Sequence, residues 1–301
     1  MIRSTVGDLA YWNKRVDFLT KAIATKWELL SKPSVNPIYD PQFTFDLGTY
    51  CVTLMIRRYS RGDTIRSLPE SFDEVLNAWE LSNKLAVEVC AKEGLTTCRD
   101  WDFSLTNLNH YNYCFWLIGL ALTLEIPEDQ WQRLLALVGG VGQDILLDRV
   151  ITTREPGRPI GKELLHPKPY ARLLNAIDAL PVRQAEALLE FVEHWYPELK
   201  RPAPKDRYAP SIQPFWYTYG DPPNHPLAME NYFGRWCIEA VAAVKAFNLD
   251  DSLCLGHEHY PGDLLRPDGP STHTLRPGND LSSKQGALTR LASRLRRKSS
   301  T

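Results

Sequence analysis

The residues best suited to bind a metal ion are one cysteine and two histidines near residue 255. Cys254, His257 and His259 form a Cys-x-x-His-x-His pattern, and zinc prefers thiolate and imidazole ligands. A zinc site needs three or four ligands, and the remaining one would have to come from a segment that the sequence does not identify. Histidines near helix ends also often bond a backbone carbonyl. The sequence therefore favours no metal and no cofactor, with a metal-dependent enzyme as an alternative.

Other patterns that carry catalytic chemistry are missing. The one glycine-rich loop, Gly139-Gly140-Val141-Gly142, follows a helical pattern and precedes no Lys-Ser/Thr pair, so it predicts a helix break and not a phosphate site. Neither the Gly-x-Ser-x-Gly pattern of hydrolases nor the His-Glu-x-x-His pattern of zinc proteases occurs. The carboxylates are dispersed, and their spacing identifies no acid–base pair. We therefore predict no catalytic residues and a protein that is not an enzyme.

Acidic side chains at helical spacing are the candidates for contacting a partner. Glu186, Glu190 and Glu193 share one face of a predicted helix, and Asp144 and Asp148 repeat the i, i+4 spacing on an earlier segment. Like charges at this spacing cost about 0.2–0.5 kcal/mol per pair, which an ordinary solvated surface tolerates. An acidic patch would also attract a basic partner, because complementary charge speeds encounter. We predict these five residues as the partner-binding site.

Charge is divided unevenly along the chain. Residues 1–265 carry 27 basic and 34 acidic residues, a net charge of −7, whereas residues 266–301 carry 8 and 2, a net charge of +6. The basic residues gather near the end of the chain, at Arg290, Arg294, Arg296, Arg297 and Lys298. This tail leaves a nucleic-acid-binding adaptor as a second alternative, but it is short and has no interleaved aromatic residues. The sequence favours a flexible end that contacts neither nucleic acid nor membrane.

The spacing of apolar residues predicts helices along most of the chain. The i, i+3, i+4, i+7 pattern begins near Tyr11, with Asp8 as the N-cap, and runs to Leu30. Further helices are expected at 43–59, 67–94, 104–125, 127–151 with a break at the glycine-rich loop, 169–180, 181–195 and 229–248. No strand alternation and no internal repeat is present. The sequence predicts an all-α fold, a two-domain helical bundle with loop-rich connections.

The same pattern suggests three parts. These are an N-terminal helical domain at 1–125, a C-terminal helical domain at 126–265 and the basic tail at 266–301. The most apolar stretch, Cys114 to Leu124, is about eleven residues long, which suits a buried core helix and is too short for a bilayer. No signal peptide precedes the first helix, so we expect a cytoplasmic protein. Its six cysteines lack CxxC spacing and are expected to be reduced and mostly buried.

The residues from Asn231 to Leu265 carry the most specific pattern. In order, the pieces are Tyr232-Phe233-Gly234-x-Trp236, Glu239-Ala240-x-Ala242-x-Val244-Lys245, Leu249-Asp250-Asp251-Ser252 and Tyr260-Pro261-x-Asp263-Leu264. This segment resembles the C-terminal domain of the PoNi-type immunity proteins, which protect bacteria against polymorphic nuclease toxins delivered by type VI and related secretion systems. The earlier helices match the family's N-terminal domain only in pattern.

Independently of the resemblance, the pattern of apolar residues in this segment predicts a packed helix. Phe233 and Trp236 fall on its buried stripe, and Gly234 lies inside it at a cost of about 1 kcal/mol relative to alanine. Arg235 and Glu239 are expected to form an exposed i, i+4 pair. These are architectural roles, so the segment that carries the resemblance is expected to be core and not the binding surface.

The resemblance implies an immunity protein that binds and neutralises a cognate secreted nuclease effector, and so protects the producing cell and its kin. Its partner would be the toxin protein, with no cofactor. Neutralisation would occur by covering the toxin's active site or by blocking a conformational or oligomeric step, and the sequence does not separate these mechanisms.

Overall fold

The computed structural model describes residues 2–100, 103–202, 213–222 and 224–274. The regular elements of these residues are α-helices joined by loops and short 3-10 helices, which confirms the all-α prediction. None of these helices is long and apolar enough to cross a membrane. One large cluster of buried apolar side chains contains residues from every α-helix. The domain boundary expected at residue 125 stays a prediction.

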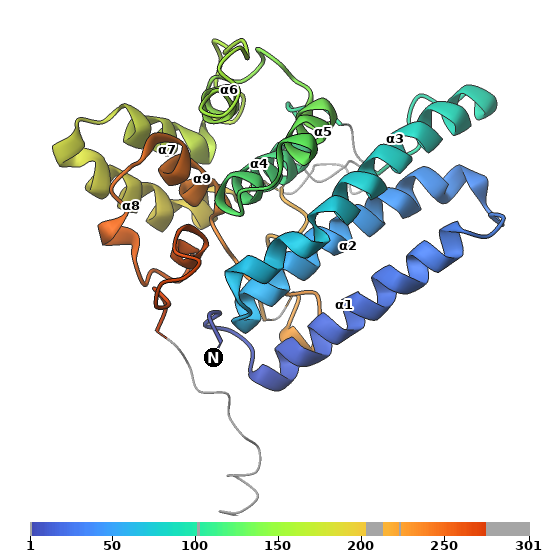
Figure 1. Ribbon diagram of the computed structural model, residues 1–301, viewed down its shortest axis with the longest axis horizontal. Helices are drawn as coiled ribbons and strands as arrows, with labels where there is room; N and C mark the ends of the chain where they lie inside the picture. Colours follow the sequence, from blue (N-terminus) through green and yellow to red (C-terminus); the bar gives the residue numbers. More distant parts are fainter. Residues whose placement is uncertain (1, 101–102, 203–212, 223, 275–301) are drawn as a thin grey trace, which may run out of the picture.

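Three long helices lie side by side in the N-terminal half (Figure 1). They are α1 (Leu9–Leu30), α2 (Asp40–Arg61) and α3 (Phe72–Glu93). The 3-10 helices η1 (Pro37–Tyr39) and η2 (Ile65–Ser71) connect them. Asp8 caps α1 as predicted, because its side chain accepts a hydrogen bond from the backbone N–H of Tyr11 at 2.7 Å.

The centre of the molecule is α4 (Leu108–Thr123), all of whose residues are buried. This confirms the core helix expected at the most apolar stretch. It packs against α9 (Ile238–Phe247) so closely that a Cβ on Gly119 would lie 2.7 Å from the Ile238 side chain. After α4 come α5 (Glu128–Val138) and α6 (Ile145–Thr152), separated by the predicted break at the glycine-rich loop.

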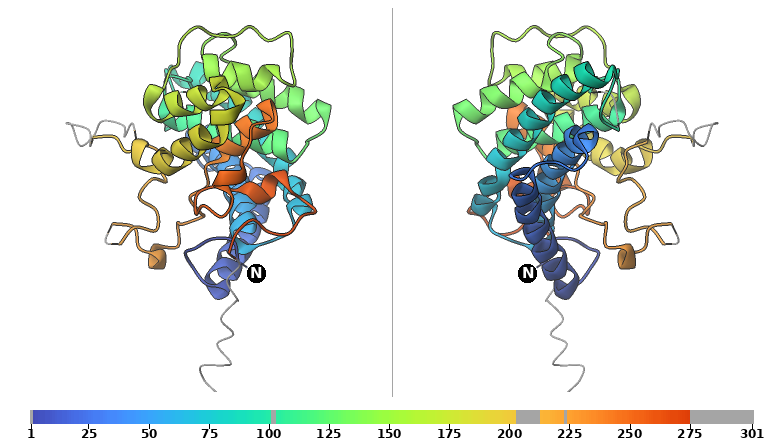
Figure 2. Two further views of the ribbon diagram at one scale, coloured as in Figure 1. Left: turned by 90° about the vertical axis from the view of Figure 1, so that its left-hand side faces the viewer. Right: turned by 90° about the vertical axis from the view of Figure 1, so that its right-hand side faces the viewer.

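The C-terminal half contributes a helical hairpin and a segment that returns to the first helices. The hairpin is α7 (Pro167–Asp178) with α8 (Pro181–Glu198), and each helix begins at a proline. The following segment contains η3 (Leu227–Met229) and contacts α1, where the Tyr11 hydroxyl donates to the Tyr232 carbonyl at 2.8 Å. The chain then forms α9, η4 (Ser252–Cys254) and η5 (Gly262–Leu265). Figure 2 shows this return beside α1 and α2.

The helix predicted over 229–248 is wrong in its first half, because α9 begins only at Ile238. The carbonyl groups that would start it are bonded to side chains of α2 instead. Arg57 donates to the carbonyl oxygens of Glu230 and Asn231 at 2.9 and 3.3 Å. Ser60 donates to that of Phe233 at 2.8 Å. Residues 230–237 therefore follow a non-helical path along α2.

The tail predicted to be flexible from residue 266 is packed at its beginning. The Nε2 atom of His273 lies 2.8 Å from the Tyr59 hydroxyl, in the interior. The Thr272 backbone N–H donates to Asp263 at 2.6 Å. The prediction is thus wrong for residues 266–274, which fold back onto α2 and η5. Residues 275–301, with the arginine-rich end, lie outside the described residues.

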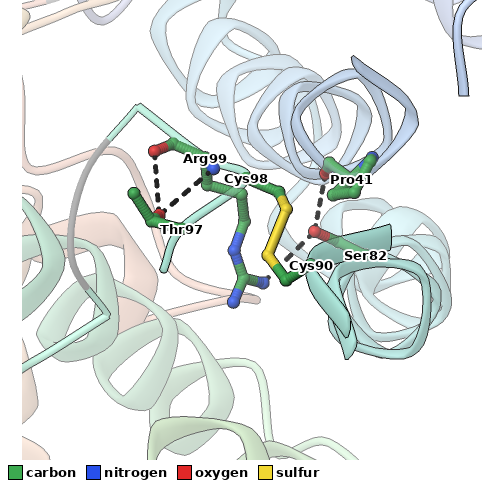
Figure 3. The surroundings of a disulfide bond; sticks show 6 residues. All are labelled: Pro41, Ser82, Cys90, Thr97, Cys98 and Arg99. Atoms are coloured by element: carbon green, nitrogen blue, oxygen red, sulfur yellow. Dashed lines mark hydrogen bonds between the residues drawn. A yellow bond between two sulfur atoms is a disulfide. The ribbon is translucent and has the colours of Figure 1, made fainter. Parts of the chain in front are cut away.

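Two cysteines depart from the reduced state that we predicted. Cys90 and Cys98 form a disulfide, with Cα atoms 6.2 Å apart (Figure 3). The α3 helix ends at Gly94 in a left-handed conformation, which turns the chain back toward Cys90. Pairing depends on this distance in space, so the missing CxxC spacing was no evidence against it. The free cysteines of the described residues are buried as predicted, at Cys51, Cys114, Cys237 and Cys254.

Candidate functional site

Two of the five predicted partner-binding residues are buried and belong to the core. Asp144 is the N-cap of α6, and its side chain accepts from the backbone N–H groups of Leu146 and Leu147 at 3.1 and 2.7 Å. It also accepts from the Tyr111 hydroxyl and from the Leu165 N–H at 3.0 and 2.8 Å. A fully buried side chain that accepts from four donors has no surface to offer a partner.

Asp148 has an internal cation as its partner. The Nε atom of Arg158 donates to Asp148 at 2.6 Å, and both side chains are buried. The Gly161 N–H donates to the second carboxylate oxygen at 3.1 Å. The acidic patch predicted at Asp144 and Asp148 is therefore wrong. Their i, i+4 spacing identified a helix but did not show that residues 158–165 cover this face.

The three glutamates of α8 are exposed on one face, as their spacing predicted. Glu186 pairs with Arg183 at 3.0 Å, and Glu190 pairs with Arg172 of α7. Glu193 has no cationic partner among the residues that the structure describes. The stripe is thus partly neutralised, and its most available charge lies at Glu193. Its role in partner binding stays a prediction.

The predicted metal candidates have packing roles. His259 Nδ1 lies 3.0 Å from the Arg235 carbonyl oxygen, and His257 Nδ1 accepts from the His259 N–H at 3.1 Å. Burial, aided by nearby carboxylates, raises the pKa of the Cys254 thiol to about 12, so the thiolate is disfavoured. Within the described ranges, no three His, Cys, Asp or Glu side chains form a group that could hold a metal ion. The metal-dependent alternative therefore gains no support, and the nucleic-acid alternative rests on a tail outside the described residues.

A pocket of about 440 Å³ lies between α1, α2 and the returning segment. Apolar and aromatic side chains form much of its wall: Phe18, Leu19, Tyr50, Phe215, Tyr219, Met229 and Phe233. Three of these, Phe18, Phe215 and Met229, are large apolar residues exposed to solvent. Aromatic residues, methionine and arginine are enriched in protein–protein interfaces, so this composition fits a partner-binding surface.

Two buried arginines from neighbouring helices also line this pocket. Arg15 of α1 and Arg57 of α2 are each only 4% exposed. Arg15 pairs with Glu230 at 2.7 Å, whereas the bonds of Arg57 within the described part of the chain all go to backbone carbonyl groups. The spacing of apolar residues did not identify this site, although Arg15 lies on the apolar stripe of the first helix, between Trp12 and Phe18. A charged residue on such a stripe was the available signal.

A buried carboxylate, Glu239, contradicts the exposed pair predicted with Arg235. Its Oε1 atom accepts hydrogen bonds from Asn112, Tyr170 and Trp195 at 2.7, 2.8 and 3.3 Å. Its Oε2 atom has no partner among the described residues. Burial raises the pKa of Glu239 to about 7, against the opposing effect of these hydrogen bonds.

Replacing Glu239 by glutamine is expected to flatten the pH dependence of stability. In the unfolded chain this carboxyl ionises near its usual pKa of 4.5, whereas in the folded protein it stays protonated to about pH 7. The stability that this group contributes is therefore complete below about pH 4.5 and is lost as pH rises from there to 7, by roughly 3 kcal/mol. Glu239→Gln lacks this loss.

Urea unfolding of both proteins at pH 5, 6, 7 and 8 tests this expectation. Burial lowers the pKa values of His110 and His259 to about 4. These two groups change the stability in the opposite direction, because their contribution is lost as pH falls below the pKa that a histidine has in the unfolded chain. They are present in both proteins and cancel in the difference. Parallel stability curves for the two proteins would refute the assignment to Glu239.

Two family models match the sequence, and together they span nearly all of the described chain. One is described as "PoNe immunity protein (PoNi), N-terminal" and matches residues 3–136. The other is described as "PoNe immunity proteins (PoNi), C-terminal" and matches residues 142–264. No curated protein sequence matches the chain.

Among solved structures, the fold is similar to the crystal structure of protein PA2201 from Pseudomonas aeruginosa. The two share 18% sequence identity with a TM-score of 0.64, over 88% of this chain and 90% of that one. At this identity, the likeness supports the fold alone.

Proposed function

We propose, from the premise that this chain belongs to the PoNe immunity protein (PoNi) family, that it binds and neutralises a cognate nuclease effector. The observation that carries the proposal is the match of both family models, in order, along the chain. An immunity protein needs a surface complementary to its toxin and no chemistry of its own. The mechanism would be to cover the toxin's active site or to block a conformational or oligomeric step.

We place this activity in the cytoplasm of the producing cell and its kin. A nuclease effector delivered by a type VI or related secretion system would meet its nucleic-acid substrate there. An inhibitor in the same compartment intercepts the toxin before it reaches that substrate.

The proposal predicts a tight complex with the cognate nuclease effector. Neutralising a catalyst leaves very little free toxin, so we expect nanomolar or tighter affinity, about 12 kcal/mol of binding free energy. The two purified proteins should co-elute from a sizing column in about 0.3 M salt, which screens unspecific attraction. Co-expression should also rescue cell growth. An unrelated nuclease domain of similar net charge is the control, and separate elution of the cognate pair would contradict the proposal.

We propose the glutamate stripe of α8 as a contributor to toxin encounter. Neutralising it as Glu186→Gln, Glu190→Gln and Glu193→Gln is expected to slow association several-fold at about 50 mM salt and little at 300 mM. The reason is that rim charges act on the association rate more than on the final contacts. Stopped-flow rates at both salt concentrations measure the effect. Equal rates for the variant and the wild type would remove the stripe from the binding surface.

A further inference from the structure

We propose that the pocket between α1, α2 and the segment of residues 215–222 and 224–233 seats an acidic side chain of the toxin, held by Arg15 and Arg57. The proposal rests on the proposed function, and it adds an anchor point of opposite charge to the glutamate stripe. Arg15, Arg57 and Glu230 are its charged lining residues, so the pocket has more positive than negative charge.

The charge of Arg57 is incompletely compensated. Its guanidinium donates to the carbonyl oxygens of Glu230, Asn231 and Arg15, at 2.9, 3.3 and 3.4 Å. No carboxylate among the described residues pairs with it. Burying a cation without an anion is costly. Consistent with this, burial lowers the pKa of Arg57 to about 10, which still leaves it charged at neutral pH.

Among the described residues that line the pocket, Glu230 is the one carboxylate, and it is shared between two cations other than Arg57. Glu230 pairs with Arg15 at 2.7 Å and with Lys14 at 2.5 Å. The Nε atoms of Arg15 and Arg57 are buried and have no acceptor among the described residues. A buried donor left without a partner costs about 1–3 kcal/mol, and more when it is charged. A carboxylate that entered the pocket would supply both the missing charge and hydrogen-bond acceptors.

The exposed apolar residues at the rim of the pocket favour a protein as the molecule that supplies this carboxylate. Phe18 and Met229 are 53% and 54% exposed at its mouth. The Phe18 ring also lies 5.3 Å from the Arg15 guanidinium. Exposed apolar side chains around a charged floor resemble the centre of an interface, where a ring of apolar contacts excludes water from a buried ion pair. A partner that is basic overall and presents one carboxylate here would be oriented by both contacts.

Charge at position 18 gives a test that leaves the buried arginines in place. Phe18→Asp and Phe18→Lys both remove the exposed ring and differ only in sign. We expect Phe18→Asp to weaken toxin binding about 100-fold, by repelling the acidic anchor, and Phe18→Lys to weaken it at most about tenfold. Val35, which is fully exposed on the turn after α1, provides the matched control. Val35→Asp and Val35→Lys should both bind as wild type.

The alternatives predict different orders of affinity. Equal weakening by the two Phe18 variants would show that no charge is sensed in the pocket, and stronger weakening by lysine would show a cationic occupant. Wild-type affinity for both would place the pocket outside the interface. Each of these results overturns the proposal.

A second measurement needs no toxin and separates this proposal from the proposed function. Glutarate, which mimics an acidic side chain, should shift the NMR signals of the Arg15 and Arg57 Nε–H groups at concentrations up to about 50 mM, as expected for millimolar binding. Sodium chloride at matched ionic strength is the control. If the toxin does not bind the wild-type protein but glutarate still shifts these signals, the proposed function is refuted and the pocket proposal is not. Unshifted signals overturn the pocket proposal.

Discussion

Replacing Gly234 by alanine is expected to lower the free energy of unfolding by roughly 3–5 kcal/mol. Gly234 has a φ of +113°, a backbone conformation that side chains with a Cβ rarely adopt. The added Cβ would also lie 2.2 Å from Trp236 Nε1 and 2.6 Å from Ser60 Oγ. Those two atoms form a 2.8 Å hydrogen bond that ties the returning segment to α2, so neither can move freely. Backbone strain and overpacking therefore both contribute to the expected loss of stability.

Two other glycines separate these causes. Gly94 has a φ of +66° but open space around its Cβ position, so Gly94→Ala reports strain alone, about 1 kcal/mol. Gly157 has neither a positive φ nor a neighbour within 4 Å, so Gly157→Ala should be nearly neutral. Urea unfolding of the three variants gives the comparison. If Gly234→Ala were as stable as Gly157→Ala, the non-helical path of residues 230–237 would be wrong.

The structure and the local sequence pattern predict opposite signs for the change in stability caused by Gly234→Ala. In the predicted helix over 229–248, Gly234→Ala would stabilise by about 1 kcal/mol. The pattern identified α9 itself, because apolar residues recur at helical spacing from Ile238 onward. It could not identify where α9 begins, since the carbonyl groups of Glu230 and Phe233 are bonded by Arg57 and Ser60. Those partners are 173 residues earlier in the chain, and no local window contains them.

The candidate site, like α9, was predicted from the sequence only in part. Helical spacing correctly placed Glu186, Glu190 and Glu193 on the exposed face of α8. For Asp144 a better signal was available, because an aspartate just after a glycine-rich loop and directly before an apolar run is a typical N-cap. The pairing of Asp148 with Arg158 had no such signal. It depends on how residues 153–165 fold back over α6, which local spacing does not specify.

Replacing Arg158 by methionine is expected to cost roughly 3–5 kcal/mol of folding stability. Arg158 and Asp148 are both buried, with Nε and Oδ1 2.6 Å apart. Methionine keeps much of the side-chain volume but removes the cation. The Asp148 carboxylate would then remain in the interior with only two backbone N–H donors, from Gly161 and Asp144, at 3.1 and 3.3 Å. The cost is that of an uncompensated buried charge.

A double variant and a surface pair test this reasoning. Adding Asp148→Asn to Arg158→Met removes the stranded charge and should recover at least half of the lost stability, as coupled neighbours do. Arg183 and Glu186 form an exposed ion pair at 3.0 Å, so Arg183→Met should change stability by less than about 0.5 kcal/mol. Chemical unfolding of all three variants measures these differences. A loss for Arg158→Met no larger than for Arg183→Met would mean that water reaches the Asp148 carboxylate, and Asp148 would return to the candidates for toxin contact.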